Sequence, residues 1–518
     1  MRDMGRTRAS VNGAHFYSAP PASRPPSPVQ GPVVETLAGS WGKLGLRPVD
    51  LVFRTVGERT SELALNLALK HIQPHRVHIV RNVKPFKVAV RRMLQIAHDC
   101  NYVVYLDADC LIMESLRPFL DAIDMPYVDC YGHDRFRGPN NRGAHITRID
   151  VVNTMRQLPE PVDDIRYTLF PESHLRNVAL FRLGFKKRYK TFRILHDHFQ
   201  WHVDVFAKNA LAALRNRASF YETADFYAKS FQAAMSEWGD DAEFRVARLA
   251  VQHALSAVPQ DADPALVDRY IRELPDVARS EVGRLGLHQS DRLSLGEVEH
   301  LIHGESIRFG QSPIGIKVFG ISMWRCGARS LTKALHMLGI DTVHDPTDTA
   351  TLETITRGDA DFPVLNYYDG LTGIPVALCY QDLDRRWPGA KFVLLVRDED
   401  SLVCSFRRHC GRIATLGVDA DQGRRQELQS EPLRTASSCL TWLYPHGALD
   451  EVNHFFQTYR RHVQNVLRYF AGRENDLLVM NIIGGDGYER LADFLGVPAL
   501  KDPFPHEGRD LTDYLVGL

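Results

Sequence analysis

The segment Ile316–Gly339 constrains the fold most, because it joins a short apolar run to a basic, glycine-bearing loop and then to an amphipathic stretch. The apolar run predicts a buried strand, and apolar residues spaced by three and four positions after Ser330 predict a helix. In that order the three pieces form an anion site, since the free N–H groups and the positive dipole end of the first helical turn face the loop. The segment therefore predicts an α/β sheet with an anion bound at a strand end.

The composition of the loop narrows the choice of anion. A Walker A loop needs Gly-Lys followed by Ser or Thr after the strand, and this sequence has none there. An ordinary ATPase or kinase is therefore disfavoured. The loop ends instead in Arg325, Cys326, Gly327, Ala328, Arg329, Ser330 and Leu331.

This run resembles the 5′-phosphosulfate loop of sulfotransferases that use 3′-phosphoadenosine 5′-phosphosulfate (PAPS) as donor. Trp324 stands where that family usually has proline, and Ala328 where it usually has threonine. The resemblance implies a P-loop-like α/β domain with a parallel sheet. It also implies that residues 325–331 bind PAPS and that Arg325 takes part in catalysis.

A second motif follows the apolar run that begins at Lys391. Arg397 ends that run and Ser405 follows in the next helical stretch, which resembles the 3′-phosphate motif of the same family. The guanidinium fork grips a phosphate and the hydroxyl adds a donor. The segment Leu477–His506 resembles the family's C-terminal strand, helix and Pro-Phe-Pro turn. Three motifs in the family's order predict a sulfotransferase domain over residues 312–518.

The acceptor side of this domain is less defined. Asp369 lies in a segment that resembles the family's stretch before Trp387–Phe392, and it is a candidate catalytic residue, as general base for the acceptor proton. An aspartate in a turn also commonly bonds to nearby backbone. Both roles for Asp369 stay open at this point.

The first half of the chain shows a different pattern. Apolar runs at 51–54, 77–80 and 102–106 alternate with helical stretches, which predicts a parallel α/β sheet. Ligands of such sheets bind at the carboxyl ends of the strands. Two carboxylates, Asp107 and Asp109, directly follow the third run.

An apolar strand followed by Asp-x-Asp resembles the nucleotide-sugar site of GT-A (family 2-like) glycosyltransferases. That resemblance implies Mn²⁺ or Mg²⁺ held by Asp107, Asp109 and a histidine, for which His196 is the preferred candidate. Hard oxygen ligands suit such a cation, which stabilises negative charge on a departing diphosphate.

The loop after the first strand resembles the nucleotide-contacting loop of the same glycosyltransferases. The residues implied in binding the nucleotide sugar are Arg54, Thr55, Glu58, Arg59 and Asp107. Two further residues are less specific. His145 could line an acceptor side, and Glu172 could be an acid–base residue or a charge at a helix start.

Composition bounds the class of protein. The 518 residues are too many for one ordinary core, so at least two domains are expected. Equal numbers of basic and acidic residues, 63 each, predict no general binding of nucleic acid. Eight cysteines without a C-x-x-C pair predict neither a zinc ribbon nor a disulfide framework. The lack of an apolar run of about 18 residues predicts no membrane span, and we expect a cytoplasmic protein.

The expected domains follow from these patterns. Residues 1–47 are rich in Pro, Ser, Gly and Arg and are predicted to be disordered. Residues 48–215 are predicted to form the GT-A-like domain, 216–311 a helical tail or connector, and 312–518 the sulfotransferase domain.

Three functional hypotheses follow. In the first, one chain both transfers a sugar from a nucleotide donor and sulfates a carbohydrate or related hydroxyl acceptor with PAPS. In the second, the sulfotransferase is kept and the first half is a non-catalytic module that binds a glycan or nucleotide. In the third, the second half is an ATP-binding regulator, which the missing Walker A lysine disfavours. No pattern sets the oligomeric state.

Overall fold

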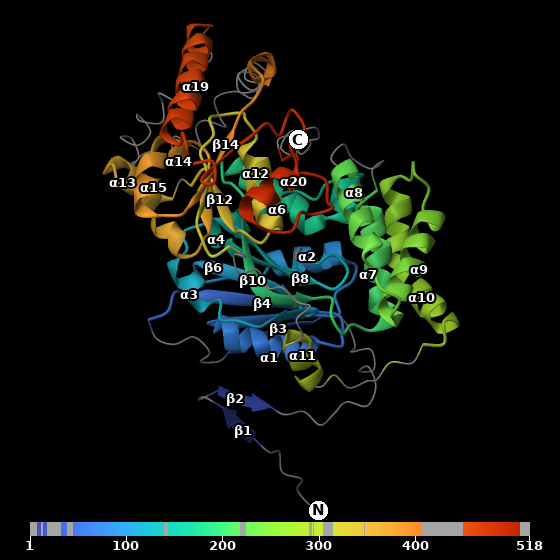
Figure 1. Ribbon diagram of the computed structural model, residues 1–518. Helices are drawn as coiled ribbons and strands as arrows, with labels where there is room; N and C mark the ends of the chain where they lie inside the picture. The colour runs from blue at the N-terminus through green and yellow to red at the C-terminus, as the bar shows by residue number, and fades with distance from the viewer. Residues whose placement is uncertain are drawn as a thin grey trace, which may run out of the picture.

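The computed structural model describes residues 8–11, 14–17, 33–38, 45–138, 143–217, 224–287, 289, 293, 295–303, 314–346, 348–405 and 449–507. Within these ranges the strands form an eight-stranded sheet in the first half of the chain, a five-stranded sheet in the second half, and a separate hairpin of β1 (Arg8–Val11) and β2 (Ala14–Tyr17) (Figure 1). Helices lie beside both large sheets, which confirms the predicted α/β class.

The first sheet is mixed rather than parallel throughout. Its order is β3 (Val33–Ala38), β5 (Arg76–Arg81), β4 (Val49–Thr55), β6 (Tyr102–Asp107), β9 (Ala144–Arg148), β8 (Tyr127–Asp134), β10 (Arg188–His196) and β7 (Cys110–Ile112). The three strands expected from the sequence, β5, β4 and β6, are parallel neighbours. Beyond them β9 runs antiparallel to both β6 and β8, so the expectation of a parallel sheet holds only for β5, β4 and β6 and for β8 with β10.

Helices cover both faces of this sheet. Apolar side chains of α1 (Ser61–Ile72) and α3 (Arg117–Ala122) pack on one face. Those of α2 (Phe86–Leu94), α4 (Ile149–Gln157) and α6 (Pro171–Arg182) pack on the other. Burial from both sides explains why β4 and β6 read as continuous apolar runs instead of alternating patterns.

One part of the expected domain plan differs in the structure, and another, the predicted helical tail, takes a definite place. Strand β3 lies inside the segment predicted to be disordered, and it pairs antiparallel with β5 at the sheet edge. Helices α8 (Ala224–Ser236), α9 (Ala242–Ala257) and α10 (Pro264–Arg284) share a separate apolar cluster with α7 (His202–Arg215) and α5 (Ile165–Leu169). These helices therefore extend the first half sideways (Figure 1), and α11 (Leu295–His303) follows them.

The second sheet is parallel, as predicted. Its order is β12 (Thr342–His344), β13 (Gly370–Thr372), β11 (Val318–Gly320), β14 (Lys391–Leu395) and β15 (Leu477–Met480). Its helical elements are α12 (Ala328–Met337), α13 (Thr349–Thr356), the 3-10 helix η2 (Pro363–Asn366), α14 (Ile374–Leu378), α15 (Tyr380–Arg386), α19 (Leu449–Tyr469) and α20 (Tyr488–Leu495). Apolar side chains of α12 and α20 pack in one cluster with side chains of this sheet.

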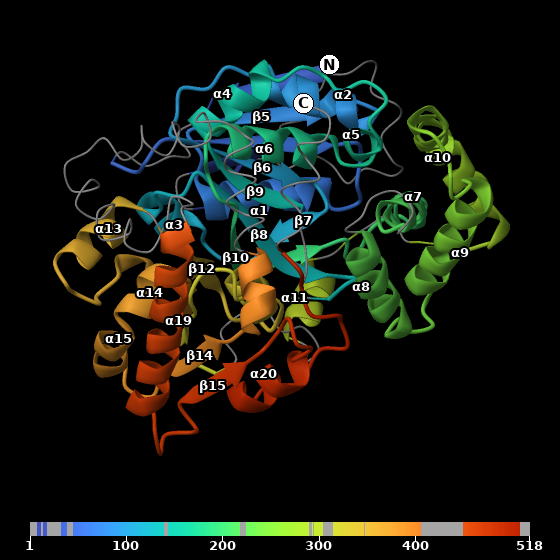
Figure 2. The same cartoon turned by 90° about the horizontal axis from the view of Figure 1, so that it is seen from above.

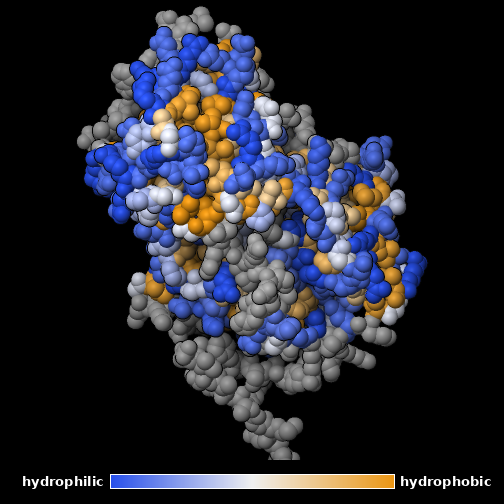
Figure 3. Space-filling model, viewed as in Figure 1, coloured by the Kyte–Doolittle hydropathy of each residue, from blue (hydrophilic) through white to orange (hydrophobic). Residues whose placement is uncertain are grey.

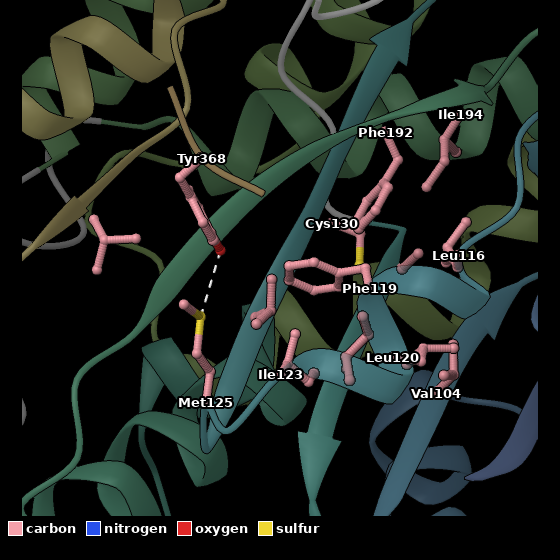
Figure 4. Packing of buried hydrophobic residues seen from close by; sticks show 14 of the residues in the cluster. Val104, Leu116, Phe119, Leu120, Ile123, Met125, Cys130, Phe192, Ile194 and Tyr368 are labelled. Atoms are coloured by element: carbon pink, nitrogen blue, oxygen red, sulfur yellow. Dashed lines mark hydrogen bonds between the residues drawn. The ribbon is translucent and has the colours of Figure 1, made fainter. Parts of the chain in front are cut away.

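The two halves share buried apolar contacts. One cluster joins Phe119 and Phe192 of the first half with Tyr368 of the second, and Figure 4 shows these side chains facing one another. The Tyr368 hydroxyl donates to Met125 Sδ at 3.4 Å across the same contact. The sheets are therefore separate, but their cores are continuous.

Polar contacts between β10 and the second half surround Asp341, which is fully buried just before β12. Figure 2 shows β10 and β12 side by side. Its carboxylate accepts from Lys190 Nζ at 2.8 Å, and from the backbone N and Oγ1 of Thr191 at 2.8 and 2.7 Å. His336 Nδ1 lies 2.8 Å from the same carboxylate. A first-half strand thus supplies most of the partners of a second-half acid.

The visible face of the molecule is mostly hydrophilic, with apolar residues gathered over the upper part, where the second half lies (Figure 3). Among the described residues, no helix is long and apolar enough to cross a membrane.

Candidate functional site

Asp107 is the last residue of β6, and Asp109 lies in the short connection between β6 and β7. Asp107 pairs with Arg54 of the neighbouring strand β4, whose Nε donates to Asp107 Oδ1 at 2.8 Å. Arg54 also lies over the ring of Phe86, 4.4 Å from its centre. Burial raises the pKa of Asp107 to about 6, although the charge of Arg54 opposes the shift.

Two residues predicted to bind the nucleotide sugar, Thr55 and Glu58, form hydrogen bonds within the loop that follows β4. Glu58 is buried, and its carboxylate accepts from Thr55 Oγ1 at 2.7 Å and from the backbone N of Val56 at 2.8 Å. Arg59 lies near the ring of Trp201, 5.7 Å from its centre. Glu58 and Thr55 therefore shape the loop.

Asp109 lies beside His196, which is at the end of β10. Its Oδ1 lies 3.7 Å from His196 Nε2, and the ammonium of Lys208 pairs with both Asp109 and Asp197. His196 Nδ1 lies 2.6 Å from Asp134 Oδ2. Burial favours the neutral imidazole, but Asp197, Asp109 and Asp134 together raise the pKa of His196 to about 9.

The predicted metal ligands therefore converge only in part. One divalent cation could bond to both Asp109 and His196 at their separation, and Cys110 offers the nearest third donor. Asp107 does not group with them, because its carboxylate pairs with Arg54, and its place in the ligand set stays a prediction. Lys208 already supplies a positive charge to Asp109.

His145 and Glu172, whose roles the sequence left open, lie beside Asp107. A small pocket is lined by Arg54, Asp107, His145 and Glu172, among others. His145 Nε2 lies 2.9 Å from Glu172 Oε1, and the His145 ring stacks on Tyr105 with centres 4.7 Å apart. Polar groups from β4, β6, β9 and α6 thus meet at one edge of the first sheet.

The basic loop of the second half follows β11 at the carboxyl edge of the parallel sheet. Arg325 has a φ of 66° and Gly327 a φ of 105°, so the chain turns sharply before α12 begins at Ala328. Ser322 fixes the start of the loop, since its hydroxyl accepts from the backbone N of Leu395 in β14 at 2.7 Å. The first N–H groups of α12 open toward the loop, as an anion site requires.

The two basic motifs predicted from the sequence lie side by side. Arg325 Nε donates to Ser405 Oγ at 3.1 Å, and Arg397 Nη1 donates to the carbonyl of Arg325 at 2.9 Å. Their strands, β11 and β14, are neighbours, which brings both motifs to one edge. The backbone N of Arg397 donates to the Tyr459 hydroxyl at 3.0 Å, which anchors it from α19.

One family model matches this region of the chain. Residues 317–510 match the family model of the sulfotransferase domain. The match contains the Arg325 loop, Arg397 and Ser405, and we use this name for the region below.

Other comparisons add little about the first half. No curated protein matches the chain. Two structures of the glycosyltransferase GlyE from Streptococcus pneumoniae TIGR4 were found at 10% identity. The apo-form structure matches over 69% of this chain and 88% of its own with a TM-score of 0.19, and the other over 68% and 86% with 0.18. Likeness at these TM-scores carries no argument about the first half.

Within the sulfotransferase domain, the loop residues divide by exposure. Cys326 and Leu331 are fully buried against the sheet, so they shape the loop from beneath. Ser330 is also largely buried, and its hydroxyl accepts from the backbone N of Glu507 at 3.2 Å. Ala328 and Arg329 are half-buried on the outer side. The C-terminal turn thus packs onto the first turn of α12.

Cys326 is expected to react very slowly with iodoacetamide at pH 8, at least about a hundredfold more slowly than the exposed Cys404. Burial raises the pKa of the Cys326 thiol to about 12, so little of the reactive thiolate is present. Mass spectrometry of labelled peptides from the folded protein measures both rates. Fast labelling of Cys326 would show that the thiol is not a packing group.

Asp369 does not lie beside the loop. It directly precedes β13, at the amino edge of the parallel sheet, whereas the loop follows β11 at the carboxyl edge. Its Oδ2 accepts from the backbone N of Asp341 at 2.9 Å. Asp369 and Arg325 therefore lie at opposite edges of the parallel sheet, and the role of Asp369 as general base stays a prediction.

The carboxyl end of β12 holds a group of residues that the sequence did not single out. His344 and Asp345 lie there, in contact with Lys186 and Arg188 from the first half. Neither half carries a motif at these positions. The only signal in the sequence is the basic run before β10, which reads as an exposed surface until the second half is placed against it.

Proposed function

We propose that residues 312–518 form a domain that transfers the sulfuryl group of PAPS to a hydroxyl of a carbohydrate or a related acceptor. The match of residues 317–510 to the sulfotransferase domain carries this proposal. The meeting of Arg325, Arg397 and Ser405 at one sheet edge supports it, because a nucleotide with two phosphate groups needs cations at two neighbouring points.

In this proposal Arg397 and Ser405 bind the 3′-phosphate, and Arg325 with the N–H groups of α12 binds the 5′-phosphosulfate. The acceptor oxygen attacks sulfur and forms the new S–O bond. The S–O bond to the 5′-phosphate breaks, its electron pair leaves with adenosine 3′,5′-bisphosphate (PAP), and the acceptor proton passes to a base or to water. Positioning and charge stabilisation supply the catalysis.

Incubation of the full chain with PAPS labelled in its sulfuryl group and a panel of neutral and acidic oligosaccharides tests the proposal. We expect labelled sulfate on at least one acceptor, and PAP should raise the melting temperature more than ATP does at equal concentration. Tighter binding of ATP than of PAP would instead revive the ATP-binding alternative.

As a second candidate activity, we propose glycosyl transfer from a nucleotide sugar by residues 48–215. The gathering of Arg54, Asp107, Asp109 and His196 at one sheet edge favours it. Mn²⁺ or Mg²⁺, held by Asp109 and His196, would stabilise the negative charge of a departing diphosphate. The positive charges of Arg54 and Lys208 neutralise Asp107 and Asp109 without any metal ion, which favours the alternative of a non-catalytic binding module.

Calorimetry with UDP and GDP, followed by turnover assays with their sugar conjugates, separates the two alternatives. Turnover that Asp109→Asn removes supports glycosyl transfer. Binding of a nucleotide without hydrolysis or transfer supports the module.

Lys208→Met is expected to strengthen the binding of Mn²⁺ by about tenfold, because it removes a positive charge that competes for Asp109 and Asp197. Electron paramagnetic resonance of free Mn²⁺ measures the affinity. Lys70→Met, which removes an exposed lysine on α1, is the control and should change nothing. An affinity that Lys208→Met leaves unaltered would show that the Asp109 cluster is not the site of Mn²⁺.

A further inference from the structure

A cluster of positive charge lies where the first half meets the sulfotransferase domain. Lys186 Nζ pairs with Asp345 Oδ2 at 3.0 Å. Arg188 donates to the backbone carbonyls of His344 and Asp345, at 2.6 and 3.1 Å. Lys186 lies just before β10 and Arg188 is the first residue of that strand, while His344 ends β12 and Asp345 follows it.

This cluster lies on the same edge of the sheet as the PAPS loop. His344 is level with Thr372 in β13, which is level with Gly320 in β11, and the loop follows Gly320 directly. Arg329, in the first turn of α12, reaches the cluster electrostatically. Burial, Arg188 and Arg329 lower the pKa of Lys186 to about 8, although Asp345 opposes the shift.

The cluster carries more positive than negative charge. Lys186 pairs with the carboxylate of Asp345, Arg188 donates to neutral backbone carbonyls, and Arg329 adds a further positive charge that acts on both. The negative charge of Asp348, the N-cap residue of α13, favours the charged form of Arg188. His344 adds no charge, because burial lowers its pKa to about 3. Excess charge at a half-buried position is stabilised when an anion binds there.

The backbone holds this cluster firmly. Asp345 has a φ of 43°, and its Oδ1 accepts from the backbone N of Ile374 at 3.1 Å. Gly373 allows this contact, since a Cβ there would lie 2.1 Å from Asp345 Oδ1. A non-glycine residue in the left-handed region, fixed by two other segments, is typical of a functional position.

We propose that Lys186 of the first half completes the acceptor side of the sulfotransferase site, where it binds an anionic group of the acceptor, a carboxylate or an ester sulfate on a carbohydrate. Arg188 is a positioning residue that holds the His344–Asp345 turn. This inference rests on the proposed sulfuryl transfer.

The sheet order favours the acceptor over the donor as the ligand of Lys186. A nucleotide held by Arg325 and Arg397 lies over β11 and β14. Lys186 lies at β12, two strands away on the other side of β11, or about 10 Å by the usual strand spacing. Its side chain remains 24% exposed, so an incoming group can reach it.

Lys187 provides a matched control. Its side chain is 23% exposed, close to the 24% of Lys186, but it pairs with Asp129 inside the first half. Lys186→Met and Lys187→Met therefore remove the same charge from adjacent positions, and among the described residues the ion pair of Lys186 reaches the sulfotransferase domain whereas that of Lys187 lies within the first half.

The test uses the full chain with labelled PAPS, an oligosaccharide that carries carboxylates and its carboxyl-reduced, neutral counterpart. We expect the wild-type protein to prefer the acidic oligosaccharide. Lys186→Met should lower kcat/KM for that acceptor by about tenfold, mainly through KM, and should leave the neutral acceptor and the Kd of PAP unchanged. Lys186→Arg should restore most of the activity, and Lys187→Met should match the wild type.

Each of the other possible results of this test leads to a different conclusion. Equal behaviour of Lys186→Met and Lys187→Met would overturn the inference, while transfer and PAP binding by the wild type would keep the proposed function. Weaker PAP binding in Lys186→Met would assign the cation to the donor and would also overturn it. A wild-type protein that binds no PAP would refute the proposed function itself.

Discussion

Arg397→Ala is expected to weaken the binding of PAP by about a hundredfold and to reduce sulfuryl transfer to background. The guanidinium of Arg397 donates to the carbonyl of Arg325 at 2.9 Å and from Nε to Ser401 Oγ at 2.9 Å. It therefore serves twice, as the proposed ligand of the 3′-phosphate and as a support of the Arg325 loop. A single substitution removes both functions.

Calorimetry with PAP and the labelled-transfer assay measure this effect. Arg460→Ala is the matched control, because Arg460 pairs with Glu399 at the surface, where the two side chains are 59% and 44% exposed. A surface pair of this kind contributes little, so the control should bind PAP normally. Normal PAP binding by Arg397→Ala would instead remove the 3′-phosphate from this position.

Two milder variants separate the charge of Arg397 from its geometry. Arg397→Lys keeps the charge but loses the fork that donates two parallel hydrogen bonds, so an intermediate loss is expected. Ser405→Ala removes only the hydroxyl that accepts from Arg325 Nε at 3.1 Å, and about a tenfold loss is expected. The order of the three losses tests whether a phosphate is gripped by the fork.

The sequence was most informative where local patterns determine structure. The apolar runs predicted β4, β6, β11 and β14, because strands of a covered sheet must be apolar on both faces. Since parallel strands end at the same edge, neighbouring strands carried Arg325 and Arg397 to one place. Local patterns of this kind need no knowledge of distant contacts.

Long-range contacts explain what the sequence could not predict. Asp369 resembled a site residue. It directly precedes β13, however, and this places it at the edge of the sheet opposite the Arg325 loop. Asp107 and Asp109 are two positions apart, yet Arg54 of β4 and Lys208 of α7 draw them to different partners. Similarly, the proposed role of Lys186 depends on its contact with Asp345, which comes from the other half of the chain.

Asp341→Asn is expected to lower the free energy of unfolding by about 3 kcal/mol at pH 7, through the contact between the halves. The buried carboxylate accepts from Lys190 Nζ at 2.8 Å and from Thr191 N at 2.8 Å. An amide can accept with only one of its two polar ends, so it leaves Lys190 or Thr191 without a partner. Asp361→Asn is the control, since the Asp361 side chain is 60% exposed in its pair with Arg386.

The effect of Asp341→Asn should depend on pH in one direction. Burial alone would raise the pKa of Asp341, but Lys190 and His336 hold it far below the ordinary value. The folded protein therefore binds this proton less readily than the unfolded chain, whose aspartates have a pKa of about 3.9. The stabilisation is present above about pH 4 and is lost as the pH falls below that value. Melting temperatures of the wild type and the variant should thus converge on acidification, and a constant difference would show that the charge of Asp341 does not join the halves.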